Sequence, residues 1–409
     1  MPGLTSLGPA DLRRVVLRFR DALRDHQEEL NRLNVYPVPD GDTGTNMALT
    51  LESVAHELAT AEAMGEVCTA MSRGSLMGAR GNSGVILSQI LRGVADVCSP
   101  LTTLGPGDLV AALRRAADAA YEAVLRPVEG TILTVVRETA EAIEALPGLD
   151  LVAMLSHAAE AADLSVARTP DLLPVLREAG VVDAGGKGFT LLLAAFLEVV
   201  AGRPIPEPAL GSTPLSVEAH LRGDDVAGLR YEVMYLLDAL DTTIPAFKDT
   251  WSAVGDSIVV VGGGGLWNCH VHTNDVGAAI EAGIEAGRPH QIRVADLFEQ
   301  VAHEHEAWVA EAAGEAGTGV VPHTEAVETA IVAVAVGNGV GRLLTSLGVQ
   351  IVVAGGQSMN PSTAQILEAV EATSARSVIV LPNNKNIVPV AQQVDALTDR
   401  HVEVVPTTS

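Results

Sequence analysis

The sequence predicts a multidomain protein: an all-α region, then a small α+β domain, then an α/β domain with a parallel sheet. Apolar residues recur at helical spacing through about the first 200 residues. Residues 202–208, which contain one glycine and three prolines, then interrupt the pattern and favour extended backbone. Beyond the break, short β-branched runs alternate with helical segments. A chain of 409 residues is too long for one ordinary core. We place the domains at 1–202, 226–310 and 325–409, with a linker at 203–225.

Each domain has its own pattern of elements. In the first, Leu12, Val15, Phe19 and Leu23 begin an apolar helical stripe. The second domain is expected to hold strands at 231–237, 257–261 and 266–272 and helices at 246–254 and 276–286. The third is expected to hold strands at 329–336, 350–354, 377–381 and 402–405, with a helix at 362–372. The glycine-rich run 337–341, which Arg342 follows, is interpreted as a strand-to-helix turn, because arginine stands where a dinucleotide-binding loop needs its last glycine.

Composition excludes several classes of protein. The formal charge of −25 repels polyanions and makes nucleic acid a poor partner. Three widely spaced cysteines, Cys68, Cys98 and Cys269, argue against a disulfide framework and for a reducing cytoplasm. The N-terminal residues lack the pattern of a signal peptide. The most apolar stretch, residues 189–196, is interrupted by Glu198 before it reaches the roughly 18 residues of a membrane span. We therefore expect a soluble cytoplasmic protein without a transmembrane segment.

Residues 34–47, NVYPVPDGDTGTNM, place two carboxylates one glycine apart before a predicted helix. Side chains two apart in an extended segment project to the same side, so Asp40 and Asp42 can grip one divalent cation. The helix would aim its first amides at an anion, with Thr43 as its N-cap. A plain turn with solvated acidic residues is the alternative. An EF-hand is excluded, because threonine and leucine occupy its required glycine and glutamate positions.

A second loop of small residues, 74–87, runs directly into an apolar helical pattern. Its glycines allow a close approach of backbone to phosphate, and Asn82 and Ser83 are candidate phosphate donors at a helix N-terminus. It matches neither the P-loop nor the dinucleotide fingerprint. Close helix packing is the alternative. Segments 128–134 and 168–188 likewise lie at the starts of predicted helices or between them. The four loops could meet at one end of the helical region.

Taken together, these motifs resemble those of the A subunit of bacterial fatty acid kinase and, less closely, of the nucleotide-binding subunit of dihydroxyacetone kinase. The resemblance covers nearly the whole chain and is carried by residues 34–47, 75–89, 130–138, 169–188, 270–274, 355–363 and 381–386. It implies an all-helical barrel for the first domain, with ADP or ATP and two Mg²⁺ ions at one mouth. Related fatty acid kinase proteins continue further than Ser409, so we expect the chain to stop inside or near the edge of its last domain.

The resemblance also implies roles for individual residues. Asp40 and Asp42 take the metal-binding positions, and Asn34 stands as a neutral oxygen ligand where dihydroxyacetone kinase places a further aspartate. Arg168, in a matching motif, is assigned as a cation near the transferred phosphoryl group. The nucleotide pocket would be lined by Thr43, Thr45, Asn46, Asn82, Ser83, Gly84, Thr131 and Asp183. These residues are matched by motif position alone, and only Asp40 and Asp42 have a strong independent chemical argument.

His270 and His272 are the best candidates for a transition-metal site, because alternate strand residues face one way and neutral imidazoles suit zinc. In the resembled family an upstream cysteine completes a zinc site with two such histidines. Arg230 stands near the matching place here and cannot ligate zinc, so the site is lost, completed by water or filled by Glu232. Two structural histidines are the alternative, and we hypothesise that zinc is absent or weak. The run 303–305, His-Glu-His, is interpreted as a solvated helix face.

The function implied is phosphoryl transfer from ATP to the carboxylate of a fatty acid, giving an acyl phosphate. By the same resemblance, a separate acyl-binding subunit presents the fatty acid, and the chain is a homodimer. A carboxylate nucleophile is already ionised and needs no strong general base, which fits the lack of an obvious catalytic triad. A kinase for dihydroxyacetone or another small polyol, and a non-catalytic nucleotide-binding scaffold, are the alternatives.

Overall fold

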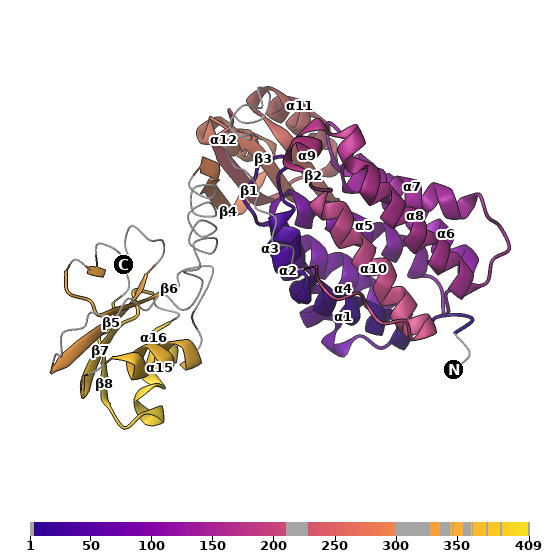
Figure 1. The fold of residues 1–409 in the computed structure, drawn as a ribbon. Coiled ribbons are helices and arrows are strands. Elements are labelled where there is room, and N and C mark those ends of the chain that lie inside the picture. Colours follow the sequence, from indigo (N-terminus) through magenta and orange to yellow (C-terminus); the bar gives the residue numbers. More distant parts are fainter. Residues whose placement is uncertain are drawn as a thin grey trace. The chain divides into compact units, whose positions relative to one another are not determined.

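The computed structural model describes residues 4–209, 228–298 and 328–407, the last range with gaps at 336–343, 346, 355–360, 362, 374 and 385–386. The chain divides into two compact units, Met1–Val301 and Ala302–Ser409. Among the described residues, the first unit contains the long helices and an antiparallel sheet, and the second contains a parallel sheet (Figure 1). The predicted succession of a helical region, a mixed region and a parallel-sheet region is thereby confirmed.

The helices of the first unit pack in chain order, and the last of the row returns to the first. α10 packs against α1, so the row closes on itself. The long helices are α1 (Pro9–Asp25), α3 (Thr43–Glu57), α4 (Met64–Gly78), α5 (Gly81–Cys98), α6 (Pro106–Ala123), α7 (Ile132–Glu144), α8 (Leu151–Leu172) and α10 (Ala184–Ala201). Short ones are α2 (Gln27–Arg32) and α9 (Pro174–Ala179), with a 3₁₀ turn η1 (Leu58–Thr60).

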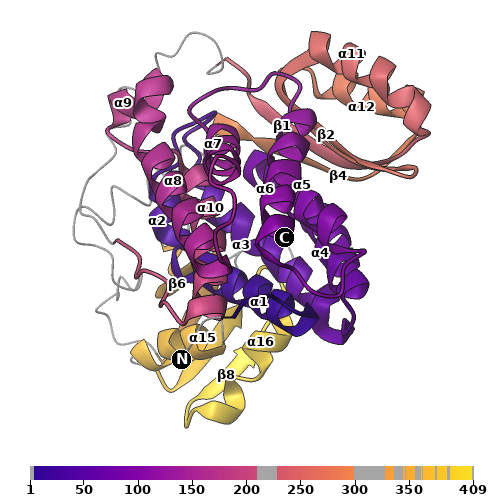
Figure 2. The same ribbon diagram turned by 90° about the vertical axis from the view of Figure 1, so that its right-hand side faces the viewer.

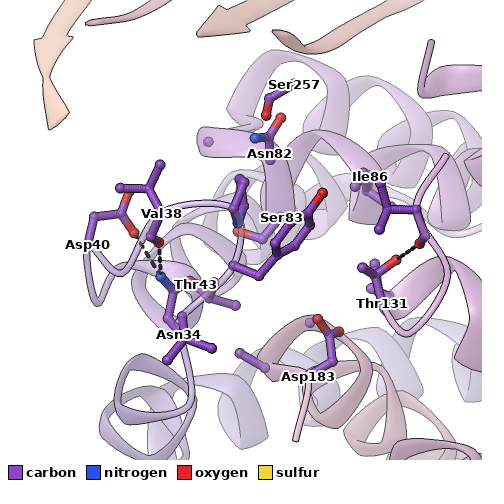
Figure 3. Close-up of a pocket in the computed structure, with 18 of the residues that line it drawn as sticks. Asn34, Val38, Asp40, Thr43, Asn82, Ser83, Ile86, Thr131, Asp183 and Ser257 are labelled. Carbon is purple, nitrogen blue, oxygen red and sulfur yellow. Dashed lines mark hydrogen bonds between the residues drawn. The ribbon is translucent and has the colours of Figure 1, made fainter. Parts of the chain in front are cut away.

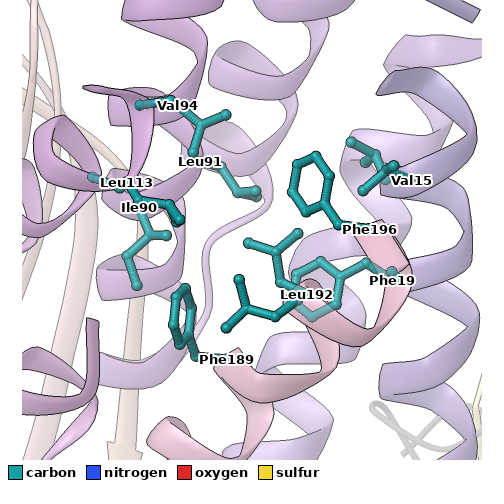
Figure 4. Packing of buried hydrophobic residues seen from close by; sticks show 14 of the residues in the cluster. Val15, Phe19, Ile90, Leu91, Val94, Leu113, Phe189, Leu192 and Phe196 are labelled. Carbon is teal, nitrogen blue, oxygen red and sulfur yellow. The ribbon is translucent and has the colours of Figure 1, made fainter. Parts of the chain in front are cut away.

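The core of this unit lies inside the row of helices. Phe19 of α1 and Phe189 of α10 are fully buried there with leucines and valines of α5 (Figure 4). α10 is long and apolar enough to span a membrane by length and composition alone, but 67% of the window concerned is buried against other helices. Its hydrophobicity is therefore accounted for by its place in the core.

The start of α3 differs from the prediction by one residue. Asp42, not Thr43, is the N-cap, because the Asp42 carbonyl accepts the first helical hydrogen bond, from the Asn46 N–H at 2.8 Å. Thr43 is the first helical residue, and its hydroxyl donates to the Asn34 side chain. The expected N-cap at Thr43 is wrong, and the threonine instead fastens the loop to the helix.

The first sheet is antiparallel, with strand order β2-β3-β1-β4. Its strands are β1 (Tyr231–Asp238), β2 (Gly255–Gly263), β3 (Leu266–Thr273) and β4 (Arg288–Asp296). α11 (Ile244–Val254), preceded by the 3₁₀ turn η3 (Asp241–Thr243), and α12 (Val276–Ala286) cover one face (Figure 2). The opposite face contributes Met234, Val259 and Val261 to an apolar cluster with Ala79, Val85 and Ala123 of the helical region.

β4 is absent from the sequence prediction, which is wrong on this point. It is an edge strand, and most of its residues are exposed, so it lacks the continuous buried run of the other strands of this sheet. The three predicted strands and two predicted helices of this region are present.

The second unit holds a parallel sheet, as predicted. Its strand order is β6-β5-β7-β8. Its elements are β5 (Thr329–Ala335), β6 (Ile351–Ala354), α15 (Thr363–Ala372), β7 (Ser377–Leu381), α16 (Val388–Gln392), η4 (Asp395–Leu397) and β8 (His401–Val404). The turn expected at 337–342, the loop 355–360, the run 303–305 and linker residues 210–225 lie outside the described residues.

Candidate functional site

A cavity of about 300 Å³ lies in the first unit, where the N-terminal ends of α3, α5, α7 and α10 face the antiparallel sheet. Four loops that are far apart in the sequence meet there, as the motif analysis suggested. The structure brings together predicted residues from all four loops (Figure 3), namely Asn34, Asp40, Asp42, Thr43, Asn82, Ser83, Thr131 and Asp183.

Asp40 and Asp42 form a half-buried acidic pair at this cavity. Burial raises the pKa of Asp40 well above its ordinary value, and the charges of Asp42 and Glu232 raise it further. Burial also raises the pKa of Asp42, and a hydrogen bond from the Asn46 side chain opposes that shift. Two carboxyl groups confined in this way are costly to ionise together, and a divalent cation between them would remove that cost.

Asn34 orients Asp40. Its Nδ2 donates to Asp40 Oδ1 at 2.9 Å and to the Val38 carbonyl at 2.7 Å, while its Oδ1 accepts the Thr43 hydroxyl. In this arrangement the amide oxygen is engaged by Thr43, so the predicted role of Asn34 as an oxygen ligand would require the amide to turn over. The side chain acts here as a support for the carboxylate.

The N-terminus of α5 offers polar groups to the cavity. Asn82 and Ser83 lie in its first turn, and Asn82 Oδ1 is buried without a hydrogen-bond partner in the part of the chain that the structure describes. Gly81 has a φ of +53°, and a Cβ there would lie 2.3 Å from Asn46 Nδ2. A side chain at position 81 would collide with the Asn46 amide, so glycine is needed there for Asn46 to bond to Asp42.

Thr131 and Asp183 cap helices and also line the cavity. Asp183 Oδ2 accepts from the Gly186 N–H at 2.6 Å at the start of α10, and burial raises its pKa to about 6. Thr131 accepts from the Leu133 N–H at the start of α7 and donates to the Val128 carbonyl at 2.8 Å. Their capping role explains these residue types, and their position adds polar atoms to the cavity wall.

Four predicted residues do not line this cavity. Thr45 bonds to Gln27 and Asn31, and Asn46 lies behind Asp42. A Cβ on Gly84 would lie 2.5 Å from Thr50 Oγ1, so that glycine serves the packing of α5 on α3. Arg168 donates to Glu138 on α7, and its side chain is 60% exposed.

The antiparallel sheet also supplies wall residues, of which Asp256 and Ser257 were not singled out from the sequence. Glu232, Asp256, Ser257 and His272 line the cavity, and so does Arg126 from the α6–α7 connection. Arg126 Nη1 lies 3.5 Å from Asp256 Oδ1. Next to this pair, the Leu125 N–H donates to the Ile258 carbonyl at 3.2 Å. Arg126, rather than Arg168, is the arginine at this cavity among the described residues, and no local sequence signal marked it.

Glu232, His270 and His272 form a compact group of metal-ligating side chains beside the cavity. Their ligand atoms all lie within 4.8 Å of one another, and Glu232 Oε1 is 3.5 Å from His270 Nδ1. Glu232 and His272 are direct cross-strand partners on β1 and β3. Both ring nitrogens of His270 and Nδ1 of His272 are buried without hydrogen-bond partners among the described residues.

The chemistry of this group suits a transition metal. Burial lowers the pKa of His272 to about 4 and that of His270 well below its ordinary value, so both rings are neutral and able to ligate. Cys269 is buried on the opposite face of β3. Arg230 pairs with Asp296 at 2.7 Å. Of the three outcomes left open for the missing thiolate, the structure places Glu232 where it can supply the third donor.

Comparison with known proteins covers most of the chain. Residues 37–198 match the DAK2 domain, residues 228–304 the middle domain of the fatty acid kinase A-subunit-like family, and residues 330–409 the C-terminal domain of the same family. An uncharacterised protein of Staphylococcus saprophyticus is 36% identical over 97% of this chain and 73% of its own length. Protein YloV of Bacillus subtilis is 37% identical, over 96% of this chain and 73% of its own.

Among solved structures, the dihydroxyacetone kinase of C. freundii, crystallised with AMP-PNP and Mg²⁺, matches with a TM-score of 0.36. It is 19% identical, and the match covers 48% of this chain and 34% of that one. A likeness at this level does not bear on the site.

Proposed function

The chain belongs to the fatty acid kinase A-subunit-like family with a DAK2 domain, and from this membership we propose that it transfers a phosphoryl group from ATP to a fatty acid carboxylate. The family supports a kinase-related role in nucleotide binding. The observation that carries the proposal is the cavity in which a half-buried pair of aspartates faces the N-terminus of α5 and the caps of α7 and α10. Helix N-termini and small polar side chains are suited to phosphate groups.

Asp40 and Asp42 fit Mg²⁺, because they are a half-buried, mutually destabilising pair of oxygen donors. When bound, Mg²⁺ would neutralise charge on the phosphates. The chain's own residues have supporting roles: Asn34 holds Asp40, Asn46 holds Asp42, and Asn82 and Ser83 donate toward the phosphates. The fatty acid carboxylate is already ionised and needs no general base, so positioning carries the reaction.

The finer features of the proposal follow from the family. We propose that the closed row of helices is the expected barrel, that ATP or ADP binds at the mouth described above, and that a separate fatty-acid-binding subunit presents the acyl chain. A cytoplasmic homodimer is part of the same proposal. The exact domain limits given above also stay predictions.

The test is trapping of the product. We expect the full chain, incubated with ATP, Mg²⁺ and a fatty-acid-loaded carrier protein, to yield acyl phosphate that hydroxylamine converts to a hydroxamate. Omitting the carrier should abolish the signal. Product formed from dihydroxyacetone without a carrier would favour a polyol kinase. ATP binding without turnover under any of these conditions would favour a scaffold, and either result would overturn the proposal.

Zinc, or another divalent transition metal, fits the group of Glu232, His270 and His272, because the orphaned imidazole nitrogens and the nearby carboxylate are ligands of the right type. This expectation of a bound metal opposes the hypothesis, made from the sequence, that zinc is absent or weakly bound, and a measurement of metal content distinguishes the two. We expect about one equivalent of metal by elemental analysis, and a large loss on Glu232→Gln. The matched control is Arg230→Gln, at the position near the family's cysteine, which should leave the metal content unchanged. Metal-free wild-type protein would uphold the original hypothesis.

A further inference from the structure

A second, smaller hollow of about 40 Å³ lies beside the α4–α5 connection. One side is formed by residues 77–80 and the other by β1, β3 and β4 of the antiparallel sheet. Asn268 Nδ2 donates to the Leu76 carbonyl at 3.1 Å and fastens the two sides together. Two arginines, Arg80 and Arg293, line this hollow from opposite sides.

Neither arginine bonds to an acidic side chain among the described residues, although Arg293 and Glu232 interact through their charges. Within the described ranges, Arg80 and Arg293 form no ion pair or side-chain hydrogen bond, and Arg80 Nε is buried with no acceptor. Burial lowers the pKa of the Arg80 guanidinium, and the Arg293 charge lowers it further, so the two like charges act on each other. The charge of Arg293 also lowers the pKa of Glu232, but burial raises that pKa to about 8, and Glu232 does not line the hollow.

This arrangement is unusual in so acidic a chain. The protein has 51 aspartates and glutamates against 26 lysines and arginines. Partly buried arginines elsewhere bond to glutamates, as Arg18 does to Glu198 and Arg137 to Glu129. Arg80 is half-buried and Arg293 is exposed, so solvent screens part of the repulsion between their charges, and an anion held between the two guanidinium groups would remove the rest.

The local backbone also departs from regular structure at this point. The β1–β4 register shifts between Met234 and Leu236, and Gln291, which lines the hollow, has a φ of +54°. Strained backbone in a non-glycine residue persists where the surrounding structure requires it, often beside a ligand site. The hollow therefore suits an oxyanion: two arginines line it, Arg80 Nε lacks an acceptor in the described part of the chain, and the β4 backbone departs there from regular strand geometry.

We propose that Arg80 and Arg293 form an oxyanion-binding subsite that accepts a phosphate or carboxylate group. Arg80 directly precedes Gly81, Asn82 and Ser83, so the subsite adjoins the helix end that faces the nucleotide cavity. Arginine suits both ligand types because its planar fork binds two oxygens at once. The subsite stands on its own contacts and does not depend on the acceptor proposed above.

The experiment uses the full chain without nucleotide or Mg²⁺ and two probes, inorganic phosphate and carboxyl-¹³C octanoate. We expect line broadening of the ³¹P or ¹³C signal by the wild-type protein, and its loss in both Arg80→Gln and Arg293→Gln. Arg73→Gln removes the same charge from an exposed position of α4 and should retain the broadening. Broadening of one probe alone identifies the ligand class.

Thermal melting separates binding from folding. We expect both glutamine variants to melt no lower than the wild type, since each removes a repelled charge, and Arg293→Lys to keep part of the binding. Broadening that survives both Arg80→Gln and Arg293→Gln would overturn the proposal, and so would no broadening of either probe by the wild type. Because no turnover is measured, these results are independent of whether the chain phosphorylates fatty acids.

Discussion

Replacement of Asp40 by asparagine is expected to abolish Mg²⁺-dependent turnover and, in metal-free buffer, to raise the melting temperature. The loss of a charged ligand should lower turnover on the order of 10³-fold, equivalent to roughly 4 kcal/mol of transition-state stabilisation. The stabilisation has a separate cause: Asp40 is half-buried beside Asp42, and asparagine keeps the acceptor oxygen for Asn34 while removing the charge. Activity and stability should therefore move in opposite directions.

The pH dependence of stability gives the same variant a second readout. A carboxyl group whose folded pKa is raised stabilises the fold only while protonated, so its ionisation weakens the fold as pH rises above the ordinary value. Asp40 is shifted in this direction, as are Asp183, to about 6, and Glu232, to about 8. These carboxyl groups should thus lower the stability of the metal-free wild type from about pH 4 to pH 8. The lowered pKa values of His270 and His272 act in the opposite direction up to about pH 6.5, so the net loss should be clearest between about pH 6.5 and pH 8, and Asp40→Asn should lose less.

The matched control is Asp249→Asn, which removes the same charge from an exposed position on α11. It should leave turnover, melting temperature and the pH profile close to those of the wild type. Full turnover in Asp40→Asn, or a melting temperature below that of the wild type without metal, would show that Asp40 is a structural residue and not a cation ligand.

Gly44→Ala is expected to destabilise the first unit by about 2–3 kcal/mol, because the new methyl has no room. A Cβ on Gly44 would lie 2.2 Å from the Gln27 carbonyl and 2.9 Å from Asn31 Oδ1. Neither neighbour can move freely: one is α2 backbone, and the other accepts the Thr45 N–H at 3.1 Å. A shift of α3 away from α2 would carry Asp42 with it, so Mg²⁺ affinity should fall as well.

Gly107→Ala is the control for this substitution. Gly107 lies in α6 with an ordinary φ, and a Cβ there meets nothing within 4 Å. The alanine should stabilise the helix by about 0.5–1 kcal/mol, since glycine loses more backbone entropy on folding. Thermal melts followed by circular dichroism at 222 nm compare the two variants. Equal melting temperatures would mean that α2 and α3 are less tightly packed than the structure shows.

The secondary structure was predictable wherever one side of an element is buried. The strands 231–237 and 266–272 were found because both faces of their sheet are covered, which buries most of their residues in one continuous run, and the helix 276–286 because burial of one side imposes a period of 3.6 on its apolar residues. β4 escaped because both of its faces are largely exposed, and without burial there is no pattern to read. The N-cap of α3 was misplaced by one residue because Asp42 and Thr43 are both good capping residues, and only the hydrogen bond to the Asp42 carbonyl distinguishes them.

The sequence by itself determined the order of the three regions, the glycine-spaced carboxylates before α3, and the alternate histidines on β3, because each depends on neighbours in the chain. Only the tertiary structure decided that Glu232 joins those histidines, that Arg126 and Asp256 close the cavity, and that Arg168 lies elsewhere, bound to Glu138. Such contacts join residues from about 30 to 130 positions apart. They arise from the pairing of β1 with β3, from the packing of the sheet against the helical region and from the packing of α7 against α8, which are long-range events that leave no periodic trace in the sequence.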